Sequence, residues 1–382
     1  MSAMLDGTLV IEVGRTRASA FAGKLLADAG AEVIALQDAG RAAALSEAAR
    51  LFMDIDKDVV TWREDGDQVL QEELAPHANL FVTDLGAEEL RRRSLDWETM
   101  HDRAPGLSYV WLRPVGTVGE GRTSAAGELS MQAISGMMHV VGHPEREPLA
   151  LPYGLGSVQL GLHGVAAATA ALYHATVTGT GHCVEISGAE VLASYVRIYG
   201  AVASYYRVPL RRDGRRAPGS GGRWPFGIFP CKDGWVAMIC RGAREFDSLL
   251  QMMGDPEWAK QERYRNLYGI AIEYPQEIDE LVSPWLMEHT RDELLDLAQR
   301  YAVPVAPVRD VAEVLADPQL RDYRHFFDRV TTSTGEVVQI PGRPWASGPR
   351  VHVERRPSLA DSLARASNPG PAPMSAPELL EI

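Results

Sequence analysis

Short apolar runs separated by polar loops open the chain in a pattern that alternates strands with a helix. Leu9–Val13 and residues 32–36 are mostly apolar runs of strand length. Between them lie a loop at 14–19 and an Ala/Leu-rich segment at 20–29, and Gly30 follows as a helix-ending residue. A strand, a helix and a second strand within about 30 residues form a βαβ unit, whose strands pair in parallel.

The same alternation continues through the first half of the chain. Residues 80–83 and 107–112 have the length and composition of buried strands. Residues 160–175 are apolar on most faces and rich in alanine, which is typical of a buried helix, and 182–187 again have strand character. This order predicts an α/β fold with an open, parallel sheet.

Composition changes divide the chain into a large and a small domain. Residues 211–223 are rich in Arg and Gly, as expected of a mobile loop or a domain boundary. A strand at 235–239 opens a smaller α/β unit. The predicted plan is therefore a large domain at 1–210, a small domain at 224–301, a return segment at 302–354 that completes the large domain, and a C-terminal tail at 355–382. The tail is rich in Pro, Ala and Ser, and we expect an arm or a disordered segment.

Charge and composition narrow the class of protein. With 51 acidic against 38 basic residues, the net charge is −13, which argues against a nucleic-acid-binding protein. An acidic protein can still hold phosphates through a local cluster of arginines. Three scattered cysteines are too few for a disulfide framework or a zinc site, and no motif indicates a metal or a flavin.

The termini and the longest apolar run predict a soluble, cytoplasmic protein. Residues 1–15 lack the basic segment that precedes the apolar run of a secretory signal. The longest continuous apolar run, at 165–173, is shorter than the roughly 20 residues that span a membrane. We therefore expect no contact with a membrane.

Residues 148–184 contain no Asp or Glu. This acid-free stretch includes the run Gly-Ser-Val-Gln-Leu-Gly-Leu-His at 156–163. With it, the following segments occur in order over more than 300 residues: 5–7, 25–34, 132–138, 178–182, 184–187, 229–236, 303–308, 313–320 and 341–344. Together they resemble the family III CoA-transferases (CaiB/BaiF), the group that includes formyl-CoA transferase, carnitine CoA-transferase and methylacyl-CoA racemase.

The resemblance implies a fold, a substrate and an assembly. It implies a Rossmann-like large domain that binds CoA, a small α/β domain, and a ring-shaped chain that interlocks with a second chain as a dimer. It also implies transfer of CoA from an acyl-CoA to a carboxylic acid, with CoA as part of the substrate and no metal or flavin cofactor.

The residue expected to act as nucleophile differs from the family pattern. The family places an Asp four residues before the Gly-Leu-His sequence, and here that position is Ser157. A carboxylate forms an anhydride and then a CoA thioester, both close in energy to the substrate thioester, so each step can reverse. A serine would form a stable ester, so we interpret Ser157 as a small polar residue in the vacated site. A serine nucleophile in a hydrolase-like reaction is the alternative.

Another acid could take over part of the chemistry. Glu128 precedes the Gln-Ala-Ile-Ser-Gly segment, where the family often carries an acid/base group. It is a possible acid or base, and equally a charged residue that is satisfied at a helix N-terminus.

The resemblance also points to residues that contact CoA. The loop at 14–19 lies between the first strand and first helix, where backbone N–H groups favour phosphates. The predicted CoA contacts are Arg15, Thr16, Arg17, Lys57 and Arg92. Exposed arginines without a ligand are the alternative for this loop. Gly219, Gly221 and Gly222 fall where the family often has a flap, which predicts a mobile lid or else an interdomain linker.

Three functions are consistent with these residues. The first, which we favour, is a CoA-transferase subunit that lacks the Asp and forms a heterodimer with a homologous chain that carries it. The second is a homodimer that binds acyl-CoA without catalysis, or that only scaffolds. The loss of the family's usual Lys and acid at Ala35 and Gln37 favours this reading. The third is an acyl-CoA lyase or isomerase with Glu128 as its base.

Overall fold

The computed structural model describes residues 3–38, 45–62, 66–119, 126–207, 211–216, 223–332 and 334–345. By packing, the chain divides into a large unit (Met1–Ser135, Leu151–Ser194 and Arg324–Ile382) and a small unit (Gly136–Ala150 and Tyr195–Tyr323). The chain thus passes into the small unit twice, at Gly136–Ala150 and at Tyr195–Tyr323, whereas the sequence placed the domain boundaries near 210 and 302. The predicted flap glycines and the tail at 355–382 lie outside the described residues.

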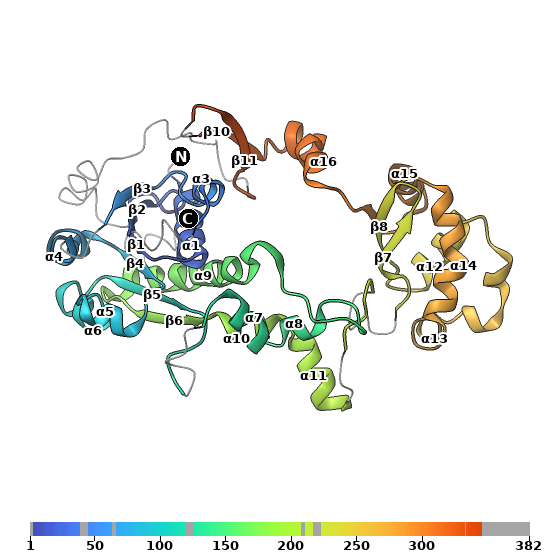
Figure 1. The fold of residues 1–382 in the computed structure, drawn as a ribbon, viewed down its shortest axis with the longest axis horizontal. Helices are drawn as coiled ribbons and strands as arrows, with labels where there is room; N and C mark the ends of the chain where they lie inside the picture. The colour runs from blue at the N-terminus through green and yellow to red at the C-terminus, as the bar shows by residue number, and fades with distance from the viewer. Residues whose placement is uncertain are drawn as a thin grey trace. The chain divides into compact units, whose positions relative to one another are not determined.

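A parallel sheet of six strands, in the order β3-β2-β1-β4-β5-β6, forms the centre of the large unit (Figure 1). Its strands are β1 (Leu9–Val13), β2 (Glu32–Gln37), β3 (Asp58–Thr61), β4 (Leu80–Thr83), β5 (Ser108–Arg113) and β6 (Cys183–Ser187). Leu9 pairs with Glu32 of β2, and Val10 pairs with Leu80 of β4. The predicted α/β fold with a parallel sheet is therefore confirmed.

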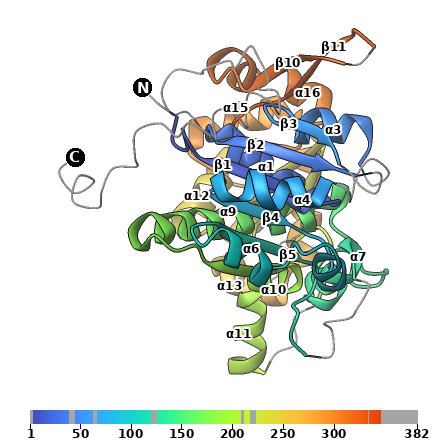
Figure 2. The ribbon, with the colours of Figure 1, turned by 90° about the vertical axis from the view of Figure 1, so that its left-hand side faces the viewer.

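Two layers of helices cover the sheet because its strands are apolar on both sides. Leu9 and Ile11 of β1 face a layer that includes α4 (Asp67–Val69) and α6 (Trp97–Arg103), which lie in front of the sheet in Figure 2. Val10 faces the opposite layer, built on α1 (Arg17–Asp28) and α9 (Leu155–Thr178). Strands buried on both faces read as continuous apolar runs, which is why the sequence reveals them clearly.

Both helices of the second layer begin earlier than their apolar patterns predict. Thr16 caps α1 through its side chain, which accepts a hydrogen bond from the N–H of Ala18, so this helix begins at Arg17 rather than at residue 20. Helix α9 begins at Leu155 rather than at residue 160. It approaches α1 closely at Gly161, where a Cβ would lie 2.5 Å from the carbonyl oxygen of Ala18. The earlier start of α9 places Ser157 in its first turn.

The remaining elements of the large unit connect the strands and close the fold. They are α3 (Glu47–Met53), η2 (Leu70–Leu74), η3 (Ala75–His77), α5 (Ala87–Arg92), α7 (Glu128–Ile134), η5 (Pro152–Gly154), α10 (Gly188–Tyr195) and the antiparallel pair β10 (Phe327–Thr331) and β11 (Val337–Pro341). After this hairpin, Arg343 donates a hydrogen bond to the carbonyl of Asp28 at 3.1 Å. This contact ties the returning chain to the end of α1.

The small unit is a three-stranded antiparallel sheet with helices. Its strands, in the order β7-β8-β9, are Phe226–Cys231, Gly234–Ile239 and Val305–Pro307. Its helices are α8 (Met137–Val140), α11 (Arg197–Tyr206), α12 (Ala243–Met252), η6 (Glu257–Lys260), η7 (Glu262–Tyr264), α13 (Leu267–Glu273), α14 (Pro275–Glu288), α15 (Arg291–Tyr301), α16 (Val311–Ala316) and η8 (Gln319–Tyr323). Trp224, Val236 and Ile278 lie in its own apolar core, which marks it as an independently packed unit.

Within the described residues, one segment is long and apolar enough to span a membrane. This segment is Pro152–Thr178, which comprises η5 and α9, and one third of its most apolar window is buried. In the structure α9 packs against α1, β5 and β6. It is a core helix of the large unit.

The three cysteines are free thiols, and we expect the native protein to resist alkylation. Cys231 and Cys240 are buried, and Cys183 is half-buried. Burial raises the pKa of Cys183 to about 11 and that of Cys240 to about 12. Because the thiolate is the reactive form, iodoacetamide at pH 8 should modify Cys183 at least about 100-fold more slowly than in the unfolded chain. Peptide mass spectrometry measures both rates, and rapid modification in the native protein would contradict this expectation.

Candidate active site

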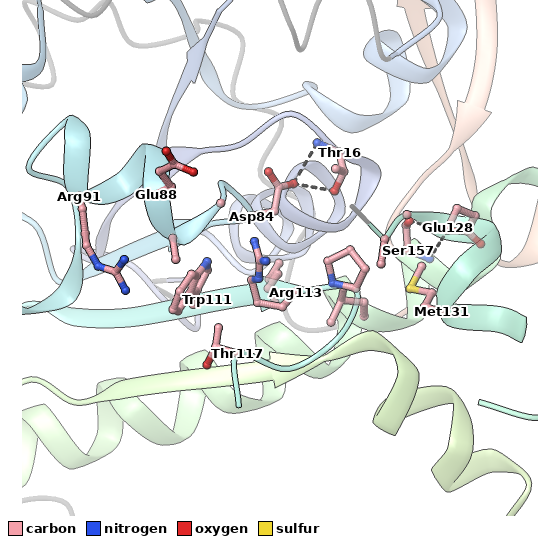
Figure 3. Close-up of a pocket in the computed structure, with 17 residues that line it drawn as sticks. Thr16, Asp84, Glu88, Arg91, Trp111, Arg113, Thr117, Glu128, Met131 and Ser157 are labelled. Carbon is pink, nitrogen blue, oxygen red and sulfur yellow. Dashed lines mark hydrogen bonds between the residues drawn. The ribbon is translucent and has the colours of Figure 1, made fainter. Parts of the chain in front are cut away.

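A cavity of about 1000 Å³ lies at the carboxyl edge of the sheet, within the large unit (Figure 3). It collects residues that follow β1, β4 and β5, among them Thr16, Asp84 and Pro114. Strands β2 and β3 are added on one side of β1, and β4, β5 and β6 on its other side, so the strand order has a switch point between β1 and β4. Ligands of open α/β sheets bind at such a switch point. The cavity is therefore the candidate functional site.

Asp84, directly after β4, occupies the N-terminus of α1. Its carboxylate accepts hydrogen bonds from the N–H of Arg15 (2.8 Å), from the N–H and hydroxyl of Thr16 (2.9 and 2.6 Å) and from the hydroxyl of Ser19 (2.7 Å). These N–H groups belong to the loop at 14–19 that was predicted to hold a phosphate. A carboxylate of the chain itself takes them in this structure, so a phosphate would have to displace Asp84 to bind there.

Arg15 and Arg17 of this loop are held by the protein. The guanidinium of Arg15 donates two hydrogen bonds to Glu89, each 2.7 Å long, and one of 2.7 Å to Asp38. The hydrogen bond to Asp38, followed by the contacts with Glu89, raises the pKa of Arg15 above its usual range. Arg17 is half-buried and lies against Gly154, the residue before α9. Of the predicted CoA contacts, Thr16 is the one that lines the cavity.

Lys57 and Arg92 do not line this cavity. Lys57 is fully buried, and its Nζ donates to Glu12 and to the carbonyl of Ala20, both at 2.7 Å. Lys57 supplies the buried counter-charge that Glu12 needs inside the apolar strand β1, and a CoA contact for Lys57 stays a prediction. Arg92 lies at the end of α5, where its side chain is 54% exposed and 4.0 Å from Glu89.

Ser157 and Glu128, 29 residues apart in sequence, meet at the N-terminus of α9. The carboxylate of Glu128 accepts the N–H of Gly156 at 2.9 Å, the N–H of Ser157 at 2.7 Å and the Ser157 hydroxyl at 2.5 Å. Gln132 adds a fourth donor at 2.6 Å. A Cβ at Gly156 would lie 2.7 Å from the carboxylate, so the close approach requires glycine. Glu128 thus satisfies a helix N-terminus, one of the two roles considered for it.

Arg113 and Trp111, at the end of β5, complete the wall beside this pair and were not singled out in the sequence. The guanidinium of Arg113 lies 5.3 Å from the centre of the Trp111 ring. The carbonyl of Leu85 accepts a hydrogen bond of 2.9 Å from Trp111 and one of 3.3 Å from Nη1 of Arg113. The signal was present: an arginine ends an otherwise apolar strand, at the edge of the sheet where ligands bind.

Chemically, the cavity offers two cations, Arg91 and Arg113, and two engaged carboxylates. Glu128 accepts two hydrogen bonds at each carboxylate oxygen, which fills its lone-pair positions, whereas Asp84 accepts one at Oδ1 and three at Oδ2. Glu88, the third acid of the lining, is an exposed residue of α5. In the described part of the chain, no group of three or more His, Cys, Asp or Glu could hold a metal ion.

The doubly wound large unit with a cavity at its switch point defines a class of α/β proteins that bind small ligands. Residues 5–360 match CoA-transferase family III, and the chain belongs to this family. The family predicted from the sequence is confirmed, and with it the class of substrate, acyl-CoA thioesters.

Curated relatives share about a quarter of their residues with the chain. The succinyl-CoA–D-citramalate CoA-transferase of Chloroflexus aurantiacus is 26% identical over 82% of this chain and 80% of its own length. The alpha subunit of the succinyl-CoA–L-malate CoA-transferase of Chloroflexus aurantiacus is 25% identical over 90% of this chain and 85% of its own. The beta subunit from the same species is 24% identical over 88% and 86%. Both kinds of subunit are thus similar to this chain.

Solved structures agree on the fold. A CAIB/BAIF family protein from Brucella suis superimposes with a TM-score of 0.80 over 96% of this chain and 99% of its own, at 23% identity. A hypothetical protein from Mycobacterium tuberculosis superimposes with a TM-score of 0.76 over 96% and 99%, at 21% identity. The α/β architecture is therefore common to this chain and these proteins.

Proposed function

We propose that this chain is a CoA-transferase subunit without the nucleophile, working with a homologous chain that carries the catalytic Asp. In this proposal Ser157 stands where the family's Asp would be. The chain binds an acyl-CoA and a carboxylic acid, and the partner forms the covalent intermediates. The observation that carries the proposal is the hydrogen bonding of Glu128, described above.

A carboxylate must present a free lone pair to attack a thioester carbonyl. The lone pairs of Glu128 are taken by Gly156, Ser157 and Gln132. Asp84 is engaged by the start of α1, through one hydrogen bond at Oδ1 and three at Oδ2. Glu88 is exposed on α5, away from the α9 turn in Figure 3. Both half-buried acids of the cavity are thus engaged by helix N-termini, which supports a role without covalent catalysis.

The similarity to both an alpha and a beta subunit of one CoA-transferase supports an assembly of two related chains. The acids named for the curated relatives, which include succinate, malate and glutarate, are dicarboxylic. We extend both features to this chain: a heterodimer with a homologous subunit, and a dicarboxylic acid among its substrates. A homodimer that binds acyl-CoA without catalysis is the alternative assembly.

The outer face of α9 is suited to a second chain. Leu162, Tyr173 and Val177 are exposed by 45%, 68% and 51%, and their spacing brings them to one side of the helix. A row of exposed apolar side chains on a core helix is typical of a protein–protein interface. We propose that this face lies against the partner in a dimer whose ring-shaped chains interlock.

The contact between Ser157 and Glu128 favours a second candidate, an acyl-CoA hydrolase. The Ser157 hydroxyl already donates to Glu128 at 2.5 Å, so Glu128 could take its proton when Ser157 attacks a thioester. The hydrogen bonds that fill the lone pairs of Glu128 argue against the lyase or isomerase, because they leave no lone pair to accept a proton from the substrate.

A CoA-transfer assay with intact-mass analysis tests the proposal. The chain is assayed alone and together with any co-purifying homologue, over a panel of acyl-CoA donors and acids, with and without hydroxylamine. We expect transfer only when both chains are present, and a hydroxylamine-sensitive CoA adduct only on the homologue. An adduct on the isolated chain would overturn the proposal. Thioester hydrolysis that disappears in both Ser157→Ala and Glu128→Gln would establish the hydrolase instead.

A further inference from the structure

Arg113 is a cation of the candidate site whose hydrogen-bonding capacity is largely unused. A guanidinium carries five N–H donors. Among the described residues, Arg113 makes one hydrogen bond, of 3.3 Å, and its buried Nε has no partner. No carboxylate in the described part of the chain forms an ion pair with it within 4.0 Å, although Asp84, Glu88 and Glu128 line the same cavity.

The surroundings of Arg113 hold it in place without neutralising its charge. Its guanidinium lies 5.3 Å from the centre of the Trp111 ring, within the range of a cation–π contact, which restrains it. Trp111 is itself fixed by its hydrogen bond to the carbonyl of Leu85. A guanidinium fixed in this way presents two parallel donors to a planar anion, at a smaller cost in conformational freedom than a flexible side chain.

The wall between Arg113 and the Ser157 turn suits a short carbon chain. Arg113 is followed by Pro114, and Met131 and Leu160 border the same cavity beside Ser157. Pro114, Met131 and Leu160 lie close together around Gly188, since each has an atom within 3.4 Å of the position that a Cβ of residue 188 would occupy. Figure 3 shows Arg113 on one side of the cavity, with Ser157 and Met131 together on the other. A molecule with one end at the Ser157 turn and a charged far end at Arg113 would match the lining.

We infer that Arg113 binds the terminal carboxylate of a dicarboxylic acyl group, and so selects acyl-CoA substrates with a second negative charge. The inference rests on the proposed function, since it assumes that acyl-CoA enters this cavity. The phosphates of CoA are the other source of an anion. The half-buried position of Arg113, beside Pro114 in the wall that leads to the Ser157 turn, favours the acyl end.

Binding of two matched thioesters tests the inference without requiring activity. Glutaryl-CoA and valeryl-CoA have the same chain length and differ only in a terminal carboxylate or methyl group. Isothermal titration of the full chain should show at least about tenfold tighter binding of glutaryl-CoA, the range expected of a charge-assisted hydrogen bond. Arg113→Met should remove this preference and leave valeryl-CoA affinity unchanged. Arg113→Lys should keep part of it.

Arg91 provides the matched control, because it lines the same cavity but is exposed. Arg91→Met should change the preference less than about threefold. Circular dichroism and the melting temperature of each variant verify its folding. Equal affinity of the wild-type chain for both esters, or a preference that survives in Arg113→Met, would overturn the inference and leave the proposed function standing.

The same titrations distinguish binding of a CoA phosphate at Arg113 from binding of the acyl carboxylate. If Arg113→Met weakens free CoA and both esters by the same factor, the anion at Arg113 is a phosphate, and the carboxylate assignment is wrong. If neither ester nor CoA binds the wild-type chain, the proposed function fails, and the inference fails with it.

Discussion

Replacing Lys57 by methionine should lower the free energy of unfolding by about 3–5 kcal/mol, because it leaves a buried charge without its partner. Lys57 and Glu12 are both fully buried, and their side chains meet at 2.7 Å between β1 and α1. Removal of Lys57 leaves the Glu12 carboxylate in the interior without the ammonium that neutralises it. Gly23 lies so close to Glu12 that a Cβ there would clash, so the site has little room for water.

Urea denaturation at pH 7 measures the effect through the midpoint of unfolding. The double variant Lys57→Met with Glu12→Leu is the matched control, since a buried pair replaced by apolar residues costs far less than one broken pair. Lys260→Met is the second control, because Lys260 and Glu257 form an exposed pair, and its removal should cost less than about 1 kcal/mol. A loss below about 1 kcal/mol for Lys57→Met would contradict the expectation.

Lys57 also shows what the sequence could and could not reveal. A lysine that follows a polar turn can point outwards to a ligand or inwards to a buried acid, and its local sequence is the same in both cases. The deciding residue is Glu12, 45 positions away, which is charged within an otherwise apolar strand. Pairing it with Lys57 requires the order of the strands, because β3 joins the sheet beside β2 and not beside β1.

Strands with long apolar runs were predicted well, and a strand without such a run was missed. β1 and β4 are apolar runs interrupted only by Glu12 and ended by Thr83, and the structure places them at the predicted residues. β3, by contrast, is a four-residue edge strand, Asp58–Thr61, which alternates half-buried and exposed residues and contains two polar ones. Nothing in such a run separates it from a loop, because edge strands bury less apolar surface.

Residues of the candidate site also differ in whether the sequence could reveal them. Ser157 was found because it departs from a family pattern, and Glu128 because it precedes a recognisable segment. Asp84 was missed, although an acid directly after a buried strand lies at the ligand-binding edge of a parallel sheet. That it closes the N-terminus of α1 follows only from the neighbouring positions of β1 and β4.

The double variant Ser157→Asp with Glu128→Gln should give the chain a covalent CoA adduct of its own. Under the proposed function, the first turn of α9 is where the family's carboxylate would act. A carboxylate introduced at position 157 is not drawn to the N-terminus of α1, because Asp84 already fills that place. The amide introduced at position 128 can still accept from the helix N–H groups through its oxygen, and its NH₂ group can donate to the new carboxylate.

The single variant Ser157→Asp is the informative comparison. It would place a second carboxylate where the Ser157 hydroxyl now lies 2.5 Å from Glu128, and two carboxylates in contact cannot both be ionised at neutral pH. We therefore expect less adduct from this variant than from the double variant, with a yield that depends strongly on pH. Ser157→Ala with Glu128→Gln supplies the background, because it has no carboxylate at this turn.

Intact-mass analysis after incubation with an acyl-CoA detects the adduct as a mass increase equal to CoA minus water. The double variant should exceed the background variant at least about tenfold in adduct yield, since only a carboxylate gives a thioester that hydroxylamine cleaves. The wild-type chain should match the background, because its Ser157 cannot form such a thioester. A folded double variant that binds acyl-CoA yet forms no adduct would show that the first turn of α9 is not where the nucleophile belongs. The absence of a carboxylate at Ser157 would then no longer explain why a partner is needed, and the subunit proposal would lose its chemical basis.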